Sequence, residues 1–255
     1  MQEAEKSHWW YRHTRALTAD LLAPWLGADG RTASVLDAGC GAGGTAATLD
    51  HHHVVGADRS RHALGIARAL RPTEPLVAAD VVSLPFTSGA FDVVVAITVL
   101  YAVPDDGAAA SELARVVRPG GALLVLEPAF QVLQRSHDVV VGGRRRYRLA
   151  GLRALVESAG MTVRRATYAH SYLVPPAFAL AMSERLRRRN DGPARSDLER
   201  SGLDRVFERL TGVERRILMR RDLPVGTSAI VLAVREQPGV TTMPGASRAP
   251  ARPGT

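Results

Sequence analysis

Short apolar runs alternate with helix-like segments through most of the 255-residue chain. Apolar runs of about four to eight residues bounded by turn residues predict buried strands, whereas an apolar residue at every third or fourth position predicts an amphipathic helix. The strand pattern occurs in Ser34–Asp37, His53–Ala57, Pro75–Ala79, Phe91–Ile97, Ala122–Glu127, Thr162–Tyr168 and Thr227–Val234. The helical pattern between them occurs in Thr45–Leu49, Arg61–Leu70, Gly107–Val117 and Leu149–Ala159. This alternation predicts an α/β fold, with a mostly parallel sheet and helices on both faces.

Two regions lie outside the alternation. The segment Leu21–Leu26 is followed by the turn residues Gly27, Asp29 and Gly30, which predicts the end of an N-terminal helix. The stretch from Leu173 to Pro224 is too long for a simple loop, and from Leu198 to Leu218 its apolar residues recur at near-helical spacing. We therefore expect an N-terminal helix and a helical cap inserted before the last strand.

These patterns predict a chain organised around one core. Because residues 237–255 are rich in Pro and Gly and lack apolar periodicity, we expect them to be flexible. The expected parts are an N-terminal helical lid (1–30), a Rossmann-like ligand-binding core (31–170), a helical cap or substrate region (171–225), the last core strand (226–236) and the tail (237–255).

The amino-acid composition limits where the protein is expected to act and which kinds of site it can form. No run of about 18 apolar residues occurs, and the polar first residues lack the apolar stretch of a secretory signal, so we expect a cytoplasmic protein without stable membrane insertion. The single cysteine, Cys40, excludes an internal disulfide and a multi-cysteine zinc site. The run His51–His53 cannot place its side chains around one ion, because neighbouring side chains of an extended chain point to opposite sides. We expect no metal site.

Positive charge is concentrated in the back half of the chain. Residues 140–221 hold 19 of the 33 Lys and Arg residues and 8 of the 25 Asp and Glu residues, a balance of 19 − 8 = +11, so the remainder carries 14 − 17 = −3. Such clustering attracts anions and favours an anionic substrate or surface. A solvated arginine-rich face is the preferred explanation, since Lys6 is the only lysine and a general arginine bias is evident.

A glycine-rich turn is the main candidate for ligand binding. Gly39, Gly41 and Gly44 form G-x-G-x-x-G directly after an apolar strand, and Asp58 follows 19 residues after Gly39, where a carboxylate can accept from ribose hydroxyls. Nicotinamide and flavin cofactors fit this spacing as well. Two further acids at strand ends, Asp37 and Asp80, argue against a pyrophosphate and favour a cationic adenosyl ligand.

The segment from Val35 to Glu127 resembles the class I S-adenosylmethionine-dependent methyltransferases, and the turn Arg118–Gly121 belongs to the same match. The resemblance implies a Rossmann-like sheet of seven strands whose last strand, here Thr227–Val234, is antiparallel and lies beside the fifth. It implies that S-adenosylmethionine is the cofactor. It assigns Asp37 and the backbone of Gly39 and Gly41 to the methionine end, Asp58 to the ribose hydroxyls, and Asp80 with Val81 to the adenine. The other candidate cofactor residues are Cys40, interpreted as a small filler inside the glycine turn, and Arg59, Ile97, Trp10 and Tyr11.

The residues for catalysis are less constrained. The loop after the fourth strand would face the methyl group by the same resemblance, but Ala102 stands where a histidine is common. Groups able to accept or relay a proton are Tyr101, His137, Tyr147 and His170. Four arginines follow in the back half, Arg144, Arg145, Arg146 and Arg148. They are interpreted either as binding a substrate carboxylate or phosphate, or as lying in a solvated loop.

The ends of the chain resemble a bacterial subgroup of these methyltransferases. The N-terminal residues Glu5, His8, Trp9 and Trp10 match its Glu-x-x-His-Trp-Trp pattern. Later segments that resemble the subgroup are Arg144–Tyr147, Ser196–Leu198 and Leu223–Ser228. The subgroup is associated with natural-product and cell-surface glycan pathways, which implies a small-molecule or lipid-linked acceptor. The aromatic residues are interpreted either as a lid that contacts the sulfonium or as plain packing of the N-terminal helix.

We therefore expect methyl transfer to a small molecule by in-line displacement, in which alignment contributes more than a dedicated base. Alternatives are an NAD(P)-dependent oxidoreductase, suggested by the glycine spacing, and a nucleic-acid methyltransferase, suggested by the basic back half. Another alternative is a pericyclase or scaffold that binds the cofactor without transferring its methyl group. The chain lacks the Pro-Pro-Tyr/Trp and Pro-Cys motifs of base methylation, so no nucleic-acid partner is expected. It is expected to act as a monomer or homodimer.

Overall fold

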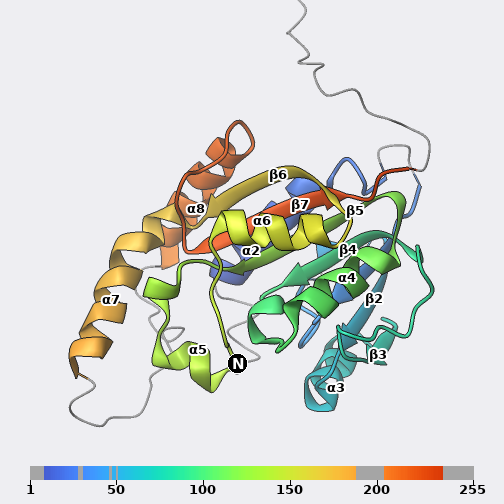
Figure 1. Ribbon diagram of the computed structural model, residues 1–255, viewed down its shortest axis with the longest axis horizontal. Helices are drawn as coiled ribbons and strands as arrows, with labels where there is room; N and C mark the ends of the chain where they lie inside the picture. The colour runs from blue at the N-terminus through green and yellow to red at the C-terminus, as the bar shows by residue number, and fades with distance from the viewer. Residues whose placement is uncertain (1–8, 28–30, 46–47, 50, 188–203, 238–255) are drawn as a thin grey trace, which may run out of the picture.

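A computed structural model describes residues 9–27, 31–45, 48–49, 51–187 and 204–237 and shows one seven-stranded sheet with helices on both faces (Figure 1). The strand order is β3-β2-β1-β4-β5-β7-β6, and only β7 runs antiparallel to its neighbours. The strands are β1 Ser34–Ala38, β2 His53–Asp58, β3 Leu76–Ala78, β4 Phe91–Ile97, β5 Val117–Pro128, β6 Thr162–Ala169 and β7 Ser228–Val234. The expected Rossmann-like sheet, with its antiparallel last strand beside the fifth, is confirmed.

Helices cover both faces of this sheet, and α5 and α7 lie beyond one end of it. Their bounds are α2 Trp9–Leu22, α3 Arg61–Leu70, α4 Asp106–Val116, α5 Ser136–Val140, α6 Leu149–Ser158, α7 Val174–Arg187 and α8 Asp204–Leu218. Figure 1 shows α4 and α6 in front of the sheet and α2 behind it. The short 3-10 helices η2 (Leu100–Ala102), η3 (Gln131–Leu133) and η4 (Ser171–Leu173) lie in the connections.

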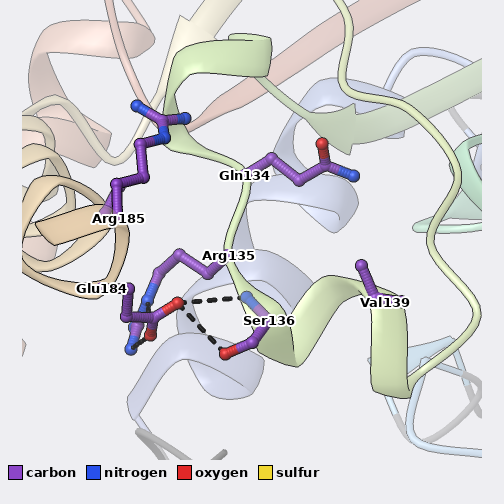
Figure 2. Close-up of a pocket in the computed structure, with 7 residues that line it drawn as sticks. Gln134, Arg135, Ser136, Val139, Glu184 and Arg185 are labelled. Atoms are coloured by element: carbon purple, nitrogen blue, oxygen red, sulfur yellow. Dashed lines mark hydrogen bonds and ion pairs between the residues drawn. The ribbon is translucent and has the colours of Figure 1, made fainter. Parts of the chain in front are cut away.

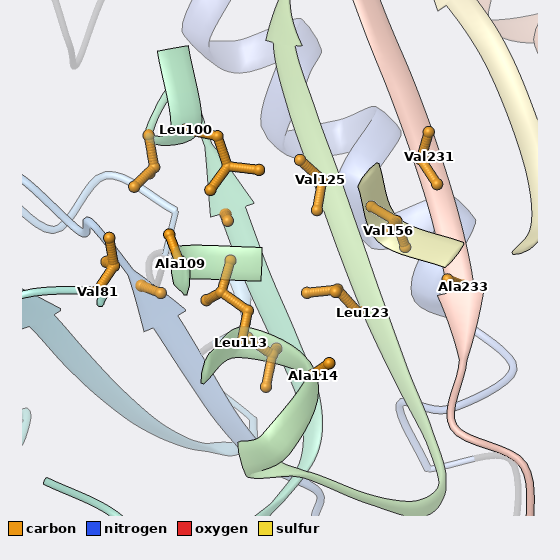
Figure 3. Close-up of a cluster of buried hydrophobic side chains, with 14 of the residues drawn as sticks. Val81, Leu100, Ala109, Leu113, Ala114, Leu123, Val125, Val156, Val231 and Ala233 are labelled. Atoms are coloured by element: carbon orange, nitrogen blue, oxygen red, sulfur yellow. The ribbon is translucent and has the colours of Figure 1, made fainter. Parts of the chain in front are cut away.

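The central strands are apolar on both faces because helices cover both. In β4, Val94 and Ala96 face α4 and α6 within one buried cluster, part of which is drawn in Figure 3, whereas Val93 and Val95 face α2 within a second cluster. A strand covered on both sides is a continuous apolar run rather than an alternating one. This is the pattern that identified these strands from the sequence.

The N-terminal and inserted helices differ in detail from the expectation. Helix α2 is present, but it ends at Leu22, before the turn residues that mark the expected end. The described part of the inserted region, residues 171–187 and 204–225, contains the two helices α7 and α8, where one amphipathic helix was expected. Helix α7 begins at Val174 with prolines in its first turn, where a missing N–H costs nothing. The expected start of the amphipathic helix, Leu198, lies outside the described residues.

The start of β5 is a second difference. The segment Arg118–Gly121, expected as a tight turn, is part of strand β5, which pairs with β4 through a register shift between Phe91 and Val93. The helix expected at Thr45–Leu49 falls partly outside the described residues, which omit 46 and 47; Thr45 lies in a turn and Thr48 in a 3-10 segment. The expected flexible tail lies outside them as well, beyond Gln237.

Candidate functional site

The candidate site lies at the carboxyl edge of the sheet, where the strand order reverses between β1 and β4. The chain leaves β1 through Gly39 and Cys40, whose N–H groups both donate to the carbonyl of Ala57 on β2, at 2.7 and 3.0 Å. Gly39 has φ of +75° and Gly41 has φ of +54°, a region that glycine enters without strain. The glycine turn is therefore fixed against β2 while its outer surface stays open to a ligand.

Gly39 also makes room for the loop that follows β4. A Cβ built on Gly39 would overlap Cγ2 of Val99, closer than two non-bonded carbon atoms can approach. The Gly39→Ala variant is expected to lose about 2–4 kcal/mol of folding stability, because it combines this overlap with a left-handed backbone. The exposed α8 variant Gly212→Ala is the matched control and should gain about 0.5–1 kcal/mol, since no atom lies within 4 Å of its new Cβ. Urea unfolding of both checks this prediction, and equal stability of the two variants would contradict it.

Asp58, the last residue of β2, connects the glycine turn to the start of α3. Its Oδ2 accepts from the N–H of Gly41 at 2.9 Å, and its Oδ1 accepts from the N–H of Ser60 at 2.7 Å. These bonds hold the carboxylate in one orientation at the strand end. Each oxygen keeps a lone pair for a further donor such as a ribose hydroxyl.

Asp37 is the most unusual carboxyl group of the site. It is 2% exposed in β1, and its Oδ2 has no hydrogen-bond partner. Burial, followed by repulsion from Glu74 and Asp58, raises the pKa of Asp37 to about 7, while a hydrogen bond from Thr45 opposes the shift. A buried acceptor without a donor is costly, so this carboxylate is arranged for a cationic or hydrogen-bonding ligand that would satisfy it.

The remaining cofactor candidates differ in exposure. Asp80 is exposed after β3 and accepts from the N–H of Val82 at 3.2 Å, whereas Val81 is buried. Arg59 is exposed at the end of β2, and Ile97 is half-buried at the end of β4. Cys40 is buried, and desolvation with nearby carboxylates raises the pKa of its thiol, which agrees with a packing role rather than a nucleophile.

A basic residue that sequence analysis missed lies over the glycine turn. Arg15 of α2 is half-buried, and its Nη1 donates to the carbonyl of Gly44 at 3.4 Å. No local pattern distinguishes it from the other arginines of the chain, because only folding brings α2 onto this turn. Its guanidinium is placed to meet an anionic group of a ligand bound there.

The candidates for proton transfer lie in different environments. Tyr101 of η2 is half-buried, and desolvation raises its pKa to about 12. The hydroxyl of Tyr147 is engaged, since it donates to Asp106 at 2.7 Å, and His170 is fully buried with a pKa well below its usual value because burial disfavours its charged form. His137 is half-buried on α5. Of these, Tyr101 lies two residues after Val99, whose side chain packs against Gly39 of the glycine turn.

The N-terminal aromatic residues pack against inserted elements. Trp9 stacks on Phe207 of α8 with ring centroids 4.8 Å apart, and Trp10 stacks on His170 at 5.7 Å. Tyr11 meets the edge of Trp10 at 5.0 Å. These contacts favour packing for Trp9, while Trp10 and Tyr11 are only half-buried.

Arginines after α5 are divided between paired and exposed groups. Arg145 pairs with Asp106 at 2.6 Å and Arg146 pairs with Asp138 at 2.9 Å, so these two side chains stabilise the loop. Arg144 and Arg148 are exposed. The backbone of Arg144 lies beside Tyr101, because its N–H donates to the carbonyl of Tyr101 at 2.8 Å.

A separate cavity of about 170 Å³ lies between α5 and α7 (Figure 2). In it, Glu184 pairs with Arg135 and accepts from the N–H and hydroxyl of Ser136, both at 3.1 Å. None of the candidate cofactor residues lines this cavity. Within the described part of the chain, no cluster of His, Cys, Asp and Glu is suited to a metal ion, and no helix has the length and hydropathy needed to cross a bilayer.

The fold and the acids at its strand ends are similar to those of class I S-adenosylmethionine-dependent methyltransferases, and the chain carries a methyltransferase domain. Residues 36–125 match the family described as "Methyltransferase domain". The chain is 37% identical over 123 residues to malonyl-[acyl-carrier protein] O-methyltransferase of Pseudescherichia vulneris, covering 48% of this chain and 49% of the relative.

Two further comparisons extend the family match. The chain is 37% identical over 116 residues to 2-methyl-6-phytyl-1,4-hydroquinone methyltransferase of Synechocystis, covering 42% of this chain and 36% of that one. It thus spans about half or less of these curated relatives. The geranyl diphosphate C-methyltransferase of Streptomyces coelicolor, solved with S-adenosyl-L-homocysteine, superposes with a TM-score of 0.54 at 18% identity over 86% of this chain and 76% of that one. That likeness concerns the fold.

Proposed function

We propose that this protein transfers the methyl group of S-adenosylmethionine to a small-molecule acceptor by in-line displacement. The observation that carries the proposal is the buried carboxylate of Asp37, whose Oδ2 lacks a partner at the base of the glycine turn. S-adenosylmethionine is a phosphate-free adenosyl ligand with an ammonium group, which such a carboxylate would neutralise. The family match over residues 36–125 supports the same ligand.

The chain's own residues suit each part of this cofactor. Asp37 would receive the ammonium group, and Arg15 over Gly44 would receive the carboxylate of the methionine end. Asp58 would accept from the ribose hydroxyls, while Asp80 would accept from the adenine amino group beside the buried Val81. When bound, the cofactor supplies an electrophilic methyl group, and the protein aligns the acceptor and excludes water.

The acceptor is proposed to enter on the side of Tyr101 and the arginines that follow α5. The names of two curated relatives give chemically different acceptors, a malonyl-[acyl-carrier protein] in one and a phytyl hydroquinone in the other. An acceptor with an anionic group, such as a glycan- or lipid-linked intermediate, would find the exposed Arg144 next to Tyr101. The acids at the strand ends disfavour the pyrophosphate of a nicotinamide cofactor.

Calorimetry with S-adenosylmethionine, S-adenosylhomocysteine and NADH tests the cofactor directly. Binding of the first two ligands in the micromolar range without binding of NADH is expected, and the reverse preference would refute the proposal. Incubation of bacterial small-molecule extracts with methyl-labelled cofactor, followed by mass spectrometry, then tests transfer. Cofactor binding without any labelled product would favour a role as a pericyclase or scaffold.

A further inference from the structure

One buried carboxylate holds the loop that follows β4, residues 98–101, here called the β4 loop. Glu127, in β5, has no exposed surface. Its Oε1 accepts from the N–H groups of Val99 and Leu100, at 3.1 and 2.7 Å, and its Oε2 accepts from the N–H of Tyr101 at 3.2 Å. Backbone donors that leave a strand need new partners when they stay buried. A single side chain provides all three here.

The β4 loop begins with a strained residue. Thr98 has φ of +54°, a conformation that β-branched residues rarely adopt. Its N–H donates to the carbonyl of Leu126, the residue before Glu127, at 2.7 Å. Strained backbone of this kind persists only where the surrounding contacts impose it. The end of β5 therefore imposes the path of the β4 loop.

The β4 loop touches two parts of the candidate site. Val99 packs so closely on the glycine turn that a Cβ on Gly39 would overlap it. Tyr101 lies at the other end, where its carbonyl accepts from the N–H of Arg144, and a Cβ on Gly143 would lie 2.6 Å from its ring. Movement of this loop would thus change the glycine turn and the segment after α5 together.

We propose that Glu127 is a positioning residue that sets the β4 loop for methyl transfer, fixing Val99 against the glycine turn and Tyr101 toward the acceptor. The role in methyl transfer rests on the proposed function, whereas the control of the loop does not. Glu127 acts through backbone N–H groups and needs no contact with the cofactor or acceptor.

The charge state of Glu127 bears on this role. Burial raises its pKa to about 8, although the three N–H donors favour the ionised form, and Asp106 of α4 adds repulsion. Tyr101 and Tyr147 also face the carboxylate, and it contributes to raising the pKa of each. A carboxylate accepts through both oxygens, whereas the protonated group presents one hydroxyl that donates. The hydrogen bonds to the β4 loop are therefore complete only when Glu127 is ionised.

Hydrogen exchange of the full chain, followed amide by amide, tests the proposal. At pH 9, where Glu127 of the unchanged protein is ionised, the variant Glu127→Gln has an NH₂ donor in place of one acceptor oxygen, so the amides of Val99, Leu100 and Tyr101 should exchange at least tenfold faster in the variant. The amides of β7 should be unaffected. The control Glu157→Gln removes an exposed carboxylate that pairs with Arg153 on α6 and should leave both sets unchanged. The affinity of Glu127→Gln for S-adenosylhomocysteine, measured alongside, should fall severalfold.

The outcomes separate this inference from the proposed function. Exchange of the three amides within twofold of the unchanged protein, or equal acceleration in β7, would overturn the positioning role. If Glu127→Gln does not fold, hydrogen exchange of the unchanged protein from pH 6 to 9 provides the test. After correction for intrinsic exchange, the protection of the three loop amides should rise severalfold with pH, while the protection of the β7 amides stays constant. A flat profile would overturn the role. Absence of S-adenosylhomocysteine binding by the unchanged protein would refute the proposed function and leave the loop result standing.

Discussion

Replacement of Asp58 by alanine is expected to weaken binding of S-adenosylhomocysteine by a hundredfold or more. Its two oxygens are held by Gly41 and Ser60 and would accept from both ribose hydroxyls. Each such charge-assisted hydrogen bond is worth about 1.5–3 kcal/mol, and about 1.4 kcal/mol corresponds to a tenfold change in affinity. Calorimetry on the variant and the unchanged protein measures the loss.

Two controls show whether this loss comes from the ligand contact. Glu236→Ala removes an exposed carboxylate that pairs with Arg164 far along the chain and should leave affinity unchanged. Asp58→Asn keeps the size of the side chain and one acceptor oxygen, so it should lie between alanine and aspartate. An alanine variant that binds as tightly as the unchanged protein would remove Asp58 from the cofactor site.

Replacement of Asp37 by asparagine is expected to weaken cofactor binding more than tenfold and, in the absence of ligand, to stabilise the fold. The raised pKa, from 3.8 to about 7, means that the folded protein holds this proton more tightly than the unfolded chain does. Stability of the unchanged protein therefore falls as pH rises from about 4 to about 7 through this group, and stays constant above. The amide of the Asp37→Asn variant does not ionise, so the variant does not lose stability over this pH range.

Thermal unfolding and calorimetry across pH check both halves of this prediction. The melting temperature of Asp37→Asn should match that of the unchanged protein near pH 4 and exceed it near pH 8. Affinity of the unchanged protein for S-adenosylmethionine should rise up to about pH 7, because the ammonium group needs the ionised carboxylate, and the variant should show no such rise. The exposed Asp80→Asn is the contrast, with little change in melting temperature. A variant with lower stability at pH 8 would contradict the interpretation of Asp37.

The elements of the sheet were predictable because burial on both faces leaves a local mark. All seven strands lie within a few residues of their predicted positions, since runs such as Phe91–Ile97 contain almost only apolar residues. The predicted start of β5 was wrong because Val117–Gly121 also belong to the strand, which pairs with β4 through a register shift near Phe91. Helix α5, with five residues, is too short to show a period.

The candidate site was predictable only in part. Asp37 and Asp58 lie at the ends of β1 and β2, and Asp80 lies two residues after β3. Parallel strands bring their carboxyl ends to one edge, so local order along the chain was sufficient to group these acids. Arg15 and Glu127 were not predictable in this way. Each acts on a segment far away along the chain, Arg15 on Gly44 and Glu127 on Val99–Tyr101.

By itself, then, the sequence determined the strand order along the chain, the class of fold and the three carboxylates of the candidate cofactor site. Only the tertiary structure decided that Asp37 is buried without a full set of partners, which turns an ordinary acid into one whose pKa lies near 7. It also decided that Glu127, one more residue at the end of an apolar strand, holds the β4 loop. Both properties arise from desolvation and from contacts between distant segments, and neither leaves a pattern in neighbouring residues.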